Sequence, residues 1–376
     1  MSANKGHALV TGGAGLIGSH IVDLLIEKGY EVTILDNLDG ETHPKGKPKW
    51  LNPSARFLQG DVRNDADIRK ALQGIRFVFH QAAFGGFTEK VSHYVDVNVG
   101  GTARIFEQLA TGKFSVEKMV VASSQAIYAE GAYECGEDGA QFPPVRLLAQ
   151  LRKKEWDPLC PKCGKRLKPS LTSEEKLREG ETPYALTKEF EERLALSCGK
   201  QLGLPVVGLR YAVTYGPRQS VFNPYTGVVS VFSTRILNNL APVVYEDGEQ
   251  TRDFIFAGDV AKANLVAMES DKANFQVFNV GTGKANSIAT LARCLSSIYG
   301  KTIEPDIRGE FRIGDVRHIL LNASKLRQLG FSASVDLSEG LSRFAEWIKV
   351  QGPVEEYFTR AYDHLKRKRI VSNYAT

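Results

Sequence analysis

Apolar positions follow two different periods along the first part of the chain. Short runs of apolar, largely β-branched residues, among them HALVTG, EVTILD and KMVVASS, predict buried strands. Between them, segments such as LIGSHIVDLLIEKGY carry apolar residues at helical spacing, with Gly29 placed to end the helix. Strands that alternate with helices through short connections predict an α/β fold of the doubly wound kind, with a parallel sheet covered by helices on both faces.

The first strand-to-helix turn, VTGGAGLIGSH, contains Gly12, Gly15 and Gly18. The first glycine allows a tight turn, the second lets the backbone approach a phosphate, and the third lets the helix pack closely on the strand. The helix start offers N–H groups to a pyrophosphate. Asp36 ends the next strand, where its carboxylate would accept hydrogen bonds from an adenosine ribose and repel a 2′-phosphate. We therefore expect a site for NAD, against the alternative of a purely structural glycine-rich turn.

The regular alternation stops near Ala129 and resumes near Gly180. We expect a Rossmann-type NAD-binding domain over 1–128 and 181–215, interrupted by an insertion over 129–180. Residues 216–376 are expected to form mainly a smaller substrate-binding lobe that ends in helices.

Composition limits the classes of partner. The chain has 376 residues, of which 43% are hydrophobic and 24% charged, as in an ordinary globular protein. The net charge of +5 does not indicate nucleic acid, because phosphorylated small molecules are sufficient acidic partners. No apolar run suits a signal peptide or a membrane span, and the five cysteines do not indicate a secreted disulfide framework. The expected location is the cytoplasm.

Tyr184 and Lys188 lie four residues apart on an expected helix and therefore share one face. A tyrosine is a poor base at neutral pH because its reference pKa is near 10. A lysine and an oxidised nicotinamide would both favour the phenolate, and a shift of about three units requires about 4 kcal/mol. Ser124, at the end of the fifth expected strand, could hydrogen-bond the same substrate oxygen. The spacing alone also fits an ordinary amphipathic helix.

A series of motifs resembles one known family. The chain contains, in this order, TGGAGLIGSH, LDNL, GDV, HQAA, SSQAIY, YALTK, LRYAVTYGPRQ, RDFIFAGDVA, NVGTG and GDVRH. The set resembles the extended short-chain dehydrogenase/reductase family, in its branch of nucleotide-sugar epimerases and dehydratases. The resemblance implies a bound NAD, a C-terminal lobe that closes over a nucleoside diphosphate sugar, and a homodimer built on the helices that contain Asn98 and Tyr184.

The resemblance also implies the residues of the site. The catalytic residues would be Ser124, Tyr184 and Lys188. The cofactor would be held by Gly12, Gly15, Leu16, Ile17, Gly18, Asp36, Asn37, Asp61, Val62, Gln81, Ala82, Ala83, Asn98, Tyr184, Lys188 and Tyr211. The substrate would meet Ser124, Gln125, Arg252, Arg312 and Asp315, with the arginines on the diphosphate and Asp315 on the ribose.

Departures from the family pattern narrow the activity. A 4,6-dehydratase carries an Asp-Glu pair directly after the serine or threonine of the fifth strand, where this chain has Gln125 and Ala126. Val213 replaces a common epimerase asparagine, so one hydrogen bond to the substrate phosphates would come from elsewhere. The main hypothesis is an NAD-dependent 4-epimerase that oxidises the sugar to a 4-keto intermediate and reduces it again. The alternatives are a nucleotide-sugar dehydrogenase/reductase and a non-catalytic NAD-sensing protein of the same fold.

The insertion carries a candidate metal site. CPKCG is the turn used in zinc ribbons, and a Cys-x2-Asp pair upstream supplies a second half-site. The four candidate ligands are Cys135, Asp138, Cys160 and Cys163. An eroded ribbon without metal, or a chance CxxC, explains the pattern equally well. The insertion, with NPYTG (223–227) and FSTR (232–235) downstream, resembles the subfamily of bacterial dTDP-L-rhamnose 4-epimerases.

Overall fold

A seven-stranded parallel sheet forms the centre of the N-terminal part. The computed structural model describes residues 5–86, 90–222, 227–367 and 371–372. The strand order is β14-β9-β5-β4-β1-β2-β3, and the register of every pair is parallel. The bounds are β1 His7–Thr11, β2 Glu31–Asp36, β3 Arg56–Gln59, β4 Phe77–His80, β5 Lys118–Ser124, β9 Val206–Tyr211 and β14 Val277–Val280. The chain order reverses between β1 and β4, which is where this fold class binds ligands.

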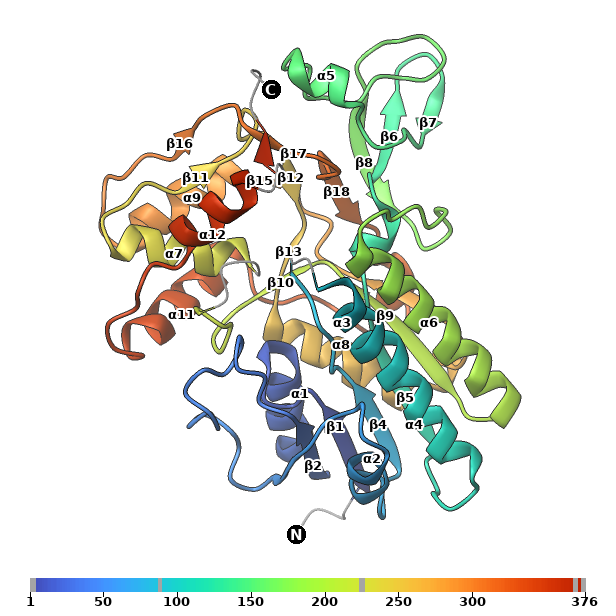
Figure 1. The fold of residues 1–376 in the computed structure, drawn as a ribbon. Helices are drawn as coiled ribbons and strands as arrows, with labels where there is room; N and C mark the ends of the chain where they lie inside the picture. Colours follow the sequence, from blue (N-terminus) through green and yellow to red (C-terminus); the bar gives the residue numbers. More distant parts are fainter. Residues whose placement is uncertain (1–4, 87–89, 223–226, 368–370, 373–376) are drawn as a thin grey trace.

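Helices cover both faces of this sheet, which confirms the predicted fold class (Figure 1). On one face α1 (Leu16–Glu27) packs beside α8 (Ala257–Glu269). On the other face lie α2 (Asp65–Ala71), α4 (Gly101–Ala110) and α6 (Pro183–Leu202). Each face has its own cluster of buried apolar side chains, as a sheet that is dry on both sides requires.

The long helix predicted before β5 has an irregular centre. It consists of α3 (Val91–Tyr94), a π-helical turn (Val95–Gly100) and α4. Gly101 lies where the helix touches the loop after β3, because a Cβ there would come 2.6 Å from Cγ2 of Val62. Gly101 therefore serves close packing beside a π turn, a feature that is frequent near functional sites.

A second sheet joins the C-terminal lobe to the insertion. Its order is β15-β12-β18-β8-β6-β7. The bounds are β15 Asn286–Ser287, β12 Thr251–Arg252, β18 His318–Leu321, β8 Lys168–Thr172, β6 Ala132–Cys135 and β7 Gly139–Gln141. β8 of the insertion pairs with β18 through Leu171 and Thr172, so the insertion extends the substrate-side sheet (Figure 1). The predicted domain boundaries stay a prediction.

Most of the rest of the C-terminal lobe packs around two apolar clusters. The helices α7 (Val228–Leu237), α9 (Ile288–Ile298) and α11 (Leu337–Lys349) contribute to the larger cluster, and α12 (Phe358–Arg367) contributes to the smaller one. The short helix α10 (Ser324–Arg327) instead places Leu326 in a cluster of the parallel sheet. Two-residue or three-residue strands pair as β10–β13 (Val213–Tyr215, Phe254–Phe256), β11–β16 (Val243–Val244, Asp306–Ile307) and β17–β19 (Phe311–Arg312, Val371–Ser372). Within the described residues, no helix is both long and apolar enough to cross a membrane.

Candidate active site

A cavity of about 940 Å³ lies between the carboxyl ends of the parallel strands and the C-terminal lobe. Its size suits a large organic ligand. The predicted site residues that line it are Gly12, Gly15, Leu16, Ile17, Gly18, Asp36, Asn37, Asp61, Val62, Gln81, Ala82, Ala83, Ser124, Gln125, Tyr184, Tyr211, Arg252, Arg312 and Asp315. Asn98 and Lys188, which we also predicted, do not line it.

The glycine-rich turn forms a cradle at one end of the cavity. Gly12 has φ +66° and approaches Ala82, whose backbone N would lie 2.8 Å from an added Cβ. At Gly18 an added Cβ would lie 2.2 Å from the carbonyl oxygen of Gly12. α1 begins after Gly15 without a side-chain cap or an acidic residue in its first turn. These residues fit a bound pyrophosphate, because the helix start keeps its N–H groups available for an anion.

Two carboxylates stand beside this cradle. Asp36 accepts hydrogen bonds from the backbone N–H of Ala14 and of Leu38, both at 2.9 Å. Asn37 donates to Asp61 at 3.0 Å. Burial raises the pKa of Asp61, but hydrogen bonds from Arg63 and Asn37 outweigh it and lower the pKa to about 2. The part of the cavity beside Asp36 and Asp61, next to the pyrophosphate cradle, is therefore anionic at neutral pH and suits ribose hydroxyls better than a 2′-phosphate.

A buried polar group fixes the middle of the cavity. The Tyr211 hydroxyl donates to Oε1 of Gln81 at 3.0 Å and accepts from Nδ2 of Asn264 at 2.8 Å. Burial raises the pKa of Tyr211, so the ring stays neutral and acts as a fixed wall. Asn264 was not predicted from the sequence. It lies on α8, far along the chain, and its only signal is a polar residue on the buried face of a helix.

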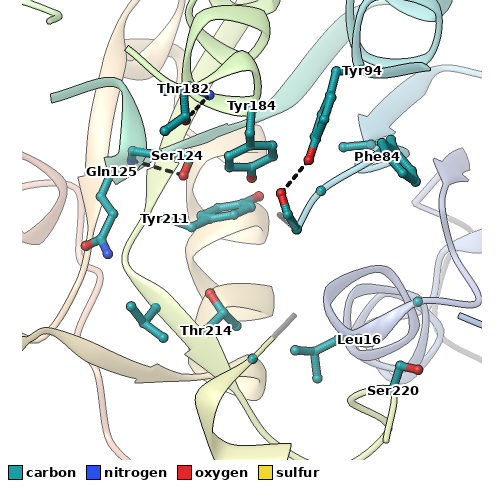
Figure 2. Close-up of a pocket in the computed structure, with 18 of the residues that line it drawn as sticks. Leu16, Phe84, Tyr94, Ser124, Gln125, Thr182, Tyr184, Tyr211, Thr214 and Ser220 are labelled. Atoms are coloured by element: carbon teal, nitrogen blue, oxygen red, sulfur yellow. Dashed lines mark hydrogen bonds between the residues drawn. The ribbon is translucent and has the colours of Figure 1, made fainter. Parts of the chain in front are cut away.

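Ser124 and Tyr184 face the same space beside Tyr211 (Figure 2). Ser124 ends β5, and its Oγ accepts from the N–H of Ala126 at 3.1 Å. The hydroxyl hydrogen therefore remains available to a substrate oxygen. Tyr184 lies in the first turn of α6, which Thr182 caps by accepting from the N–H of Ala185 at 3.2 Å. The cap fixes the start of α6 and with it the tyrosine.

Lys188 is buried behind Tyr184 and pairs with a residue that the sequence analysis missed. Its Nζ donates to Oε2 of Glu191 at 2.7 Å. Burial raises the pKa of Glu191 to about 7, against the opposing effect of Lys188. The other oxygen, Oε1, has no hydrogen-bond partner among the described residues and lies 3.8 Å from Nε2 of His80. The assignment of Lys188 to the tyrosine and the cofactor stays a prediction, and the i,i+3 spacing was the available signal for Glu191.

The Asn98 side chain makes three hydrogen bonds inside the protein, and its predicted contact with the cofactor stays a prediction. It accepts from the N–H of Phe84 at 2.7 Å and donates to the carbonyl of Phe84 at 3.0 Å. It also donates to Oγ1 of Thr187 at 3.0 Å. Asn98 therefore holds the loop after β4 against α6, and it supports the cavity from behind.

Two arginines and one carboxylate lie together at the other end of the cavity. Arg312 donates to Oδ2 of Asp315 at 2.6 and 3.0 Å, and Arg252 donates to Oδ1 at 3.2 Å. Burial raises the pKa of Asp315, but the two guanidinium groups outweigh it and hold the pKa below its usual range. Gln125 presents a buried Oε1 that has no partner among the described residues. Paired cations and a free acceptor suit a diphosphate with a polar substituent.

The four predicted metal ligands form a second cluster, outside this cavity. One ligand atom from each residue lies within 4.8 Å of the others. The sulfurs of Cys135 and Cys163 are 3.5 Å apart, and Oδ2 of Asp138 lies 3.6 Å from Cys135 and 3.1 Å from Cys160. Ligands of one tetrahedral zinc lie about 3.5–3.8 Å apart, whereas bonded sulfurs lie about 2 Å apart. All five cysteines of the chain are free thiols in the structure.

Comparison with known proteins agrees with this geometry. The family model for the NAD dependent epimerase/dehydratase family matches residues 8–147 and 162–281. The dTDP-L-rhamnose 4-epimerase of Burkholderia thailandensis is 33% identical over 90% of this chain and 94% of its own. The UDP-glucose 4-epimerase of Thermotoga maritima, solved with UDP-glucose, is 30% identical with a TM-score of 0.74, over 92% of this chain and 99% of its own. The UDP-glucuronic acid 4-epimerase of Bacillus cereus, solved with UDP-glucuronic acid and NAD, is 27% identical with a TM-score of 0.75 over the same shares. The chain belongs to the NAD dependent epimerase/dehydratase family.

Proposed function

We propose that this chain is an NAD-dependent 4-epimerase of a nucleoside diphosphate sugar, and that it also carries one structural zinc ion. The observation that supports the activity is one cavity that joins three parts. Its lining includes the glycine cradle, the pair of Ser124 and Tyr184, and the two arginines Arg252 and Arg312. The 4-epimerases among the relatives have the same overall fold.

The cytoplasm stays the predicted location.

Tyr184 is the group that we assign to take the proton of the sugar C4 hydroxyl. Its ring faces the cavity beside Ser124, whose free hydroxyl hydrogen can bond to the same substrate oxygen. When bound, NAD supplies the hydride acceptor and returns the hydride, so it is not consumed. The tyrosine returns the proton after the sugar has turned over. Gln125 and Ala126 stand where a dehydratase of this family has its Asp-Glu pair, so we do not expect dehydration.

The cofactor choice rests on Asp36. Its carboxylate already accepts two backbone N–H bonds at the cradle, so it is held in place and cannot turn away from a 2′-phosphate. We expect NAD to bind at least tenfold more tightly than NADP. Calorimetry with both cofactors tests this, and equal affinities would remove Asp36 from the site.

The test of the activity is incubation with a panel of nucleotide sugars, including UDP-glucose and dTDP-L-rhamnose, without added cofactor. An epimer that forms without net NADH supports the proposal. NADH that accumulates with a keto product would indicate a dehydrogenase instead. No turnover of any sugar, with NAD still bound, would indicate an NAD-sensing protein.

We also propose a homodimer through α6 and the helix that contains Asn98. Four large apolar side chains on these helices, Val91, Val95, Leu186 and Phe190, are between 47% and 55% exposed. The two helices lie side by side in the fold, so these side chains can form one apolar face. Light scattering should show a dimer that Phe190→Glu converts to a monomer. A monomeric unmodified protein would contradict the proposal.

A further inference from the structure

The cysteine cluster lies at the tips of two tight turns that face each other. Cys135 and Asp138 belong to the β6–β7 hairpin, where the backbone N–H groups of Glu137 and Asp138 donate to the Cys135 sulfur. In the other turn the N–H of Cys160 donates to the carbonyl of Lys165 at 2.7 Å, and the N–H of Gly164 donates to that of Cys160 at 2.9 Å. Two such turns, with four ligand atoms converging, form the geometry of a closed zinc site.

The two turns have only a small apolar core of their own. The apolar cluster around them consists of Tyr133, Cys135, Cys160 and Leu167, so two of its four members are themselves candidate ligands. A region with so small a core is typically stabilised by a metal, whose binding free energy becomes folding free energy.

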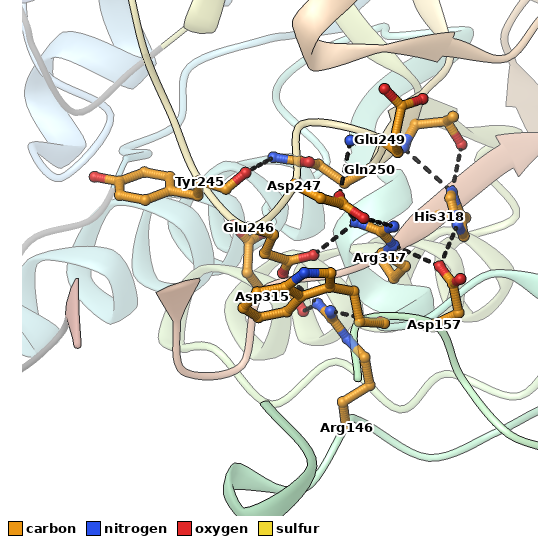
Figure 3. Close-up of polar contacts among 12 residues, drawn as sticks. Arg146, Asp157, Tyr245, Glu246, Asp247, Glu249, Gln250, Asp315, Arg317 and His318 are labelled. Atoms are coloured by element: carbon orange, nitrogen blue, oxygen red, sulfur yellow. Dashed lines mark hydrogen bonds and ion pairs between the residues drawn. The ribbon is translucent and has the colours of Figure 1, made fainter. Parts of the chain in front are cut away.

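The segment between the two half-sites reaches the substrate cavity. Residues 139–159 begin at one half-site and end at the other, and they carry Val145, which lines the cavity, and Arg146. Arg146 donates to the backbone carbonyl of Asp315 at 2.8 Å, to Glu246 at 2.9 Å and to the carbonyl of Trp156 at 2.9 Å (Figure 3). One side chain thus connects the insertion to the loop that holds Asp315.

This connection is buried and charged. The Arg146 side chain is 1% exposed and the Glu246 side chain 3%. Glu246 also accepts from Arg317 at 2.9 Å, and Arg317 donates to Asp157 of the same segment at 2.9 Å (Figure 3). Buried charges hold one geometry only while every partner stays in place, because loss of one leaves another unpaired. The position of the segment therefore fixes the position of the Asp315 loop.

We infer that a zinc ion bound by Cys135, Asp138, Cys160 and Cys163 holds both ends of this segment, so that Arg146 acts as a positioning residue for the diphosphate end of the sugar site. The inference rests on the proposed function, since it assigns the Asp315 loop to the substrate. The metal has no part in the chemistry, because four protein ligands leave it no open position. Loss of zinc releases Arg146, and the two arginines on Asp315 then lose their fixed geometry.

The first measurement is elemental analysis of protein purified without chelator, where we expect one zinc per chain. The second is calorimetric binding of UDP and dTDP, which probe the diphosphate end without turnover. We expect Cys160→Ser to lose zinc and to bind its preferred nucleotide about tenfold to a hundredfold more weakly, the range for losing a charged hydrogen bond. NAD affinity should stay within twofold in the variant, which also shows that the core is folded.

Arg146→Gln should retain zinc and show the same loss of nucleotide affinity, with KM raised and kcat nearly unchanged. Arg146→Lys should recover part of the lost nucleotide affinity, because lysine keeps the positive charge but cannot make the several hydrogen bonds of a guanidinium group. Lys168→Gln, an exposed cation in the same insertion, is the matched control and should change neither quantity. The double variant of Cys160→Ser and Arg146→Gln should bind no more weakly than either single variant, because both break one connection.

Protein with zinc well below one atom per chain and freely reactive cysteines would overturn the inference. So would unchanged nucleotide affinity in Arg146→Gln, or additive losses in the double variant. If neither nucleotide binds the zinc-loaded protein, the proposed function fails and the inference fails with it. If both nucleotides bind and Cys160→Ser does not change their affinity, only the inference fails.

Discussion

The parallel sheet and the insertion are stabilised in different ways. The sheet is buried between two apolar clusters to which most of its strands and the covering helices contribute. The insertion has two small clusters, one of four residues around the cysteines and one in which Leu151 and Trp156 meet Phe311, and it also depends on a pairing with β18, a few buried ions and, as we propose, a metal. Apolar burial scales with area, whereas a metal or an ion pair acts at one point. The cofactor part of the site is therefore stabilised by a large apolar core. The part that we assign to the sugar diphosphate depends on a few point interactions, and loss of one of them would displace it.

The largest effect that we expect is chemical and leaves both regions folded. Tyr184→Phe removes the proton acceptor but keeps the ring, so the rate should fall by about two to four orders of magnitude. Thermal unfolding, NAD affinity and zinc content should stay as in the unmodified protein. Activity retained within severalfold would show that another group accepts the proton.

Glycine substitutions compare the packing of the two regions directly. A Cβ at Gly18 would lie 2.2 Å from the carbonyl of Gly12, whereas one at Gly136 in the insertion would meet nothing within 4 Å. We expect Gly18→Ala to lower the free energy of unfolding by about 1–3 kcal/mol and to weaken NAD binding, because α1 must move away from β1. Gly136→Ala should change neither thermal unfolding nor zinc content. Equal effects at the two positions would contradict the contrast between a tight and an open backbone.

Local patterns in the sequence predicted the framework of the site, because they are set by neighbours along the chain. The cradle of Gly12, Gly15 and Gly18 follows from one strand-to-helix turn, and the cysteine half-sites from two short spacings. Partners brought together by folding were missed. Arg146 meets Asp315 across 169 positions and Asn264 meets Tyr211 across 53. Nothing in the local periodicity marks such pairs.

Glu191 is a carboxyl group that is fully buried in the core. Burial raises its pKa to about 7, so the folded protein holds a proton there that the unfolded chain, with a carboxyl near 4.5, has released. This site therefore stabilises the fold most at low pH, and its contribution is lost as pH rises through 7. Glu191→Gln removes this dependence. The melting temperature of the variant minus that of the unmodified protein should rise by about 2–4 °C between pH 5 and pH 8.

A difference that stays flat over this range would show that the Glu191 carboxyl ionises in the folded protein as it does in the unfolded chain. Glu189→Gln on the same helix serves as the control, because the Glu189 side chain is 19% exposed and pairs with Arg178 and Arg193, which are 36% and 65% exposed.

The smallest effect should come from the surface of the insertion. Lys165 pairs with Glu137 beside the cysteine cluster, but both side chains are more than half exposed, at 62% and 56%. Such pairs contribute about 0–1 kcal/mol, because water and salt screen them and two long side chains must be ordered. Lys165→Gln should therefore shift thermal unfolding by at most about 1 °C, with zinc content and nucleotide affinity unchanged. A larger shift that disappears in high salt would mean that surface charge holds the two turns together. The insertion would then not depend on a metal for its stability.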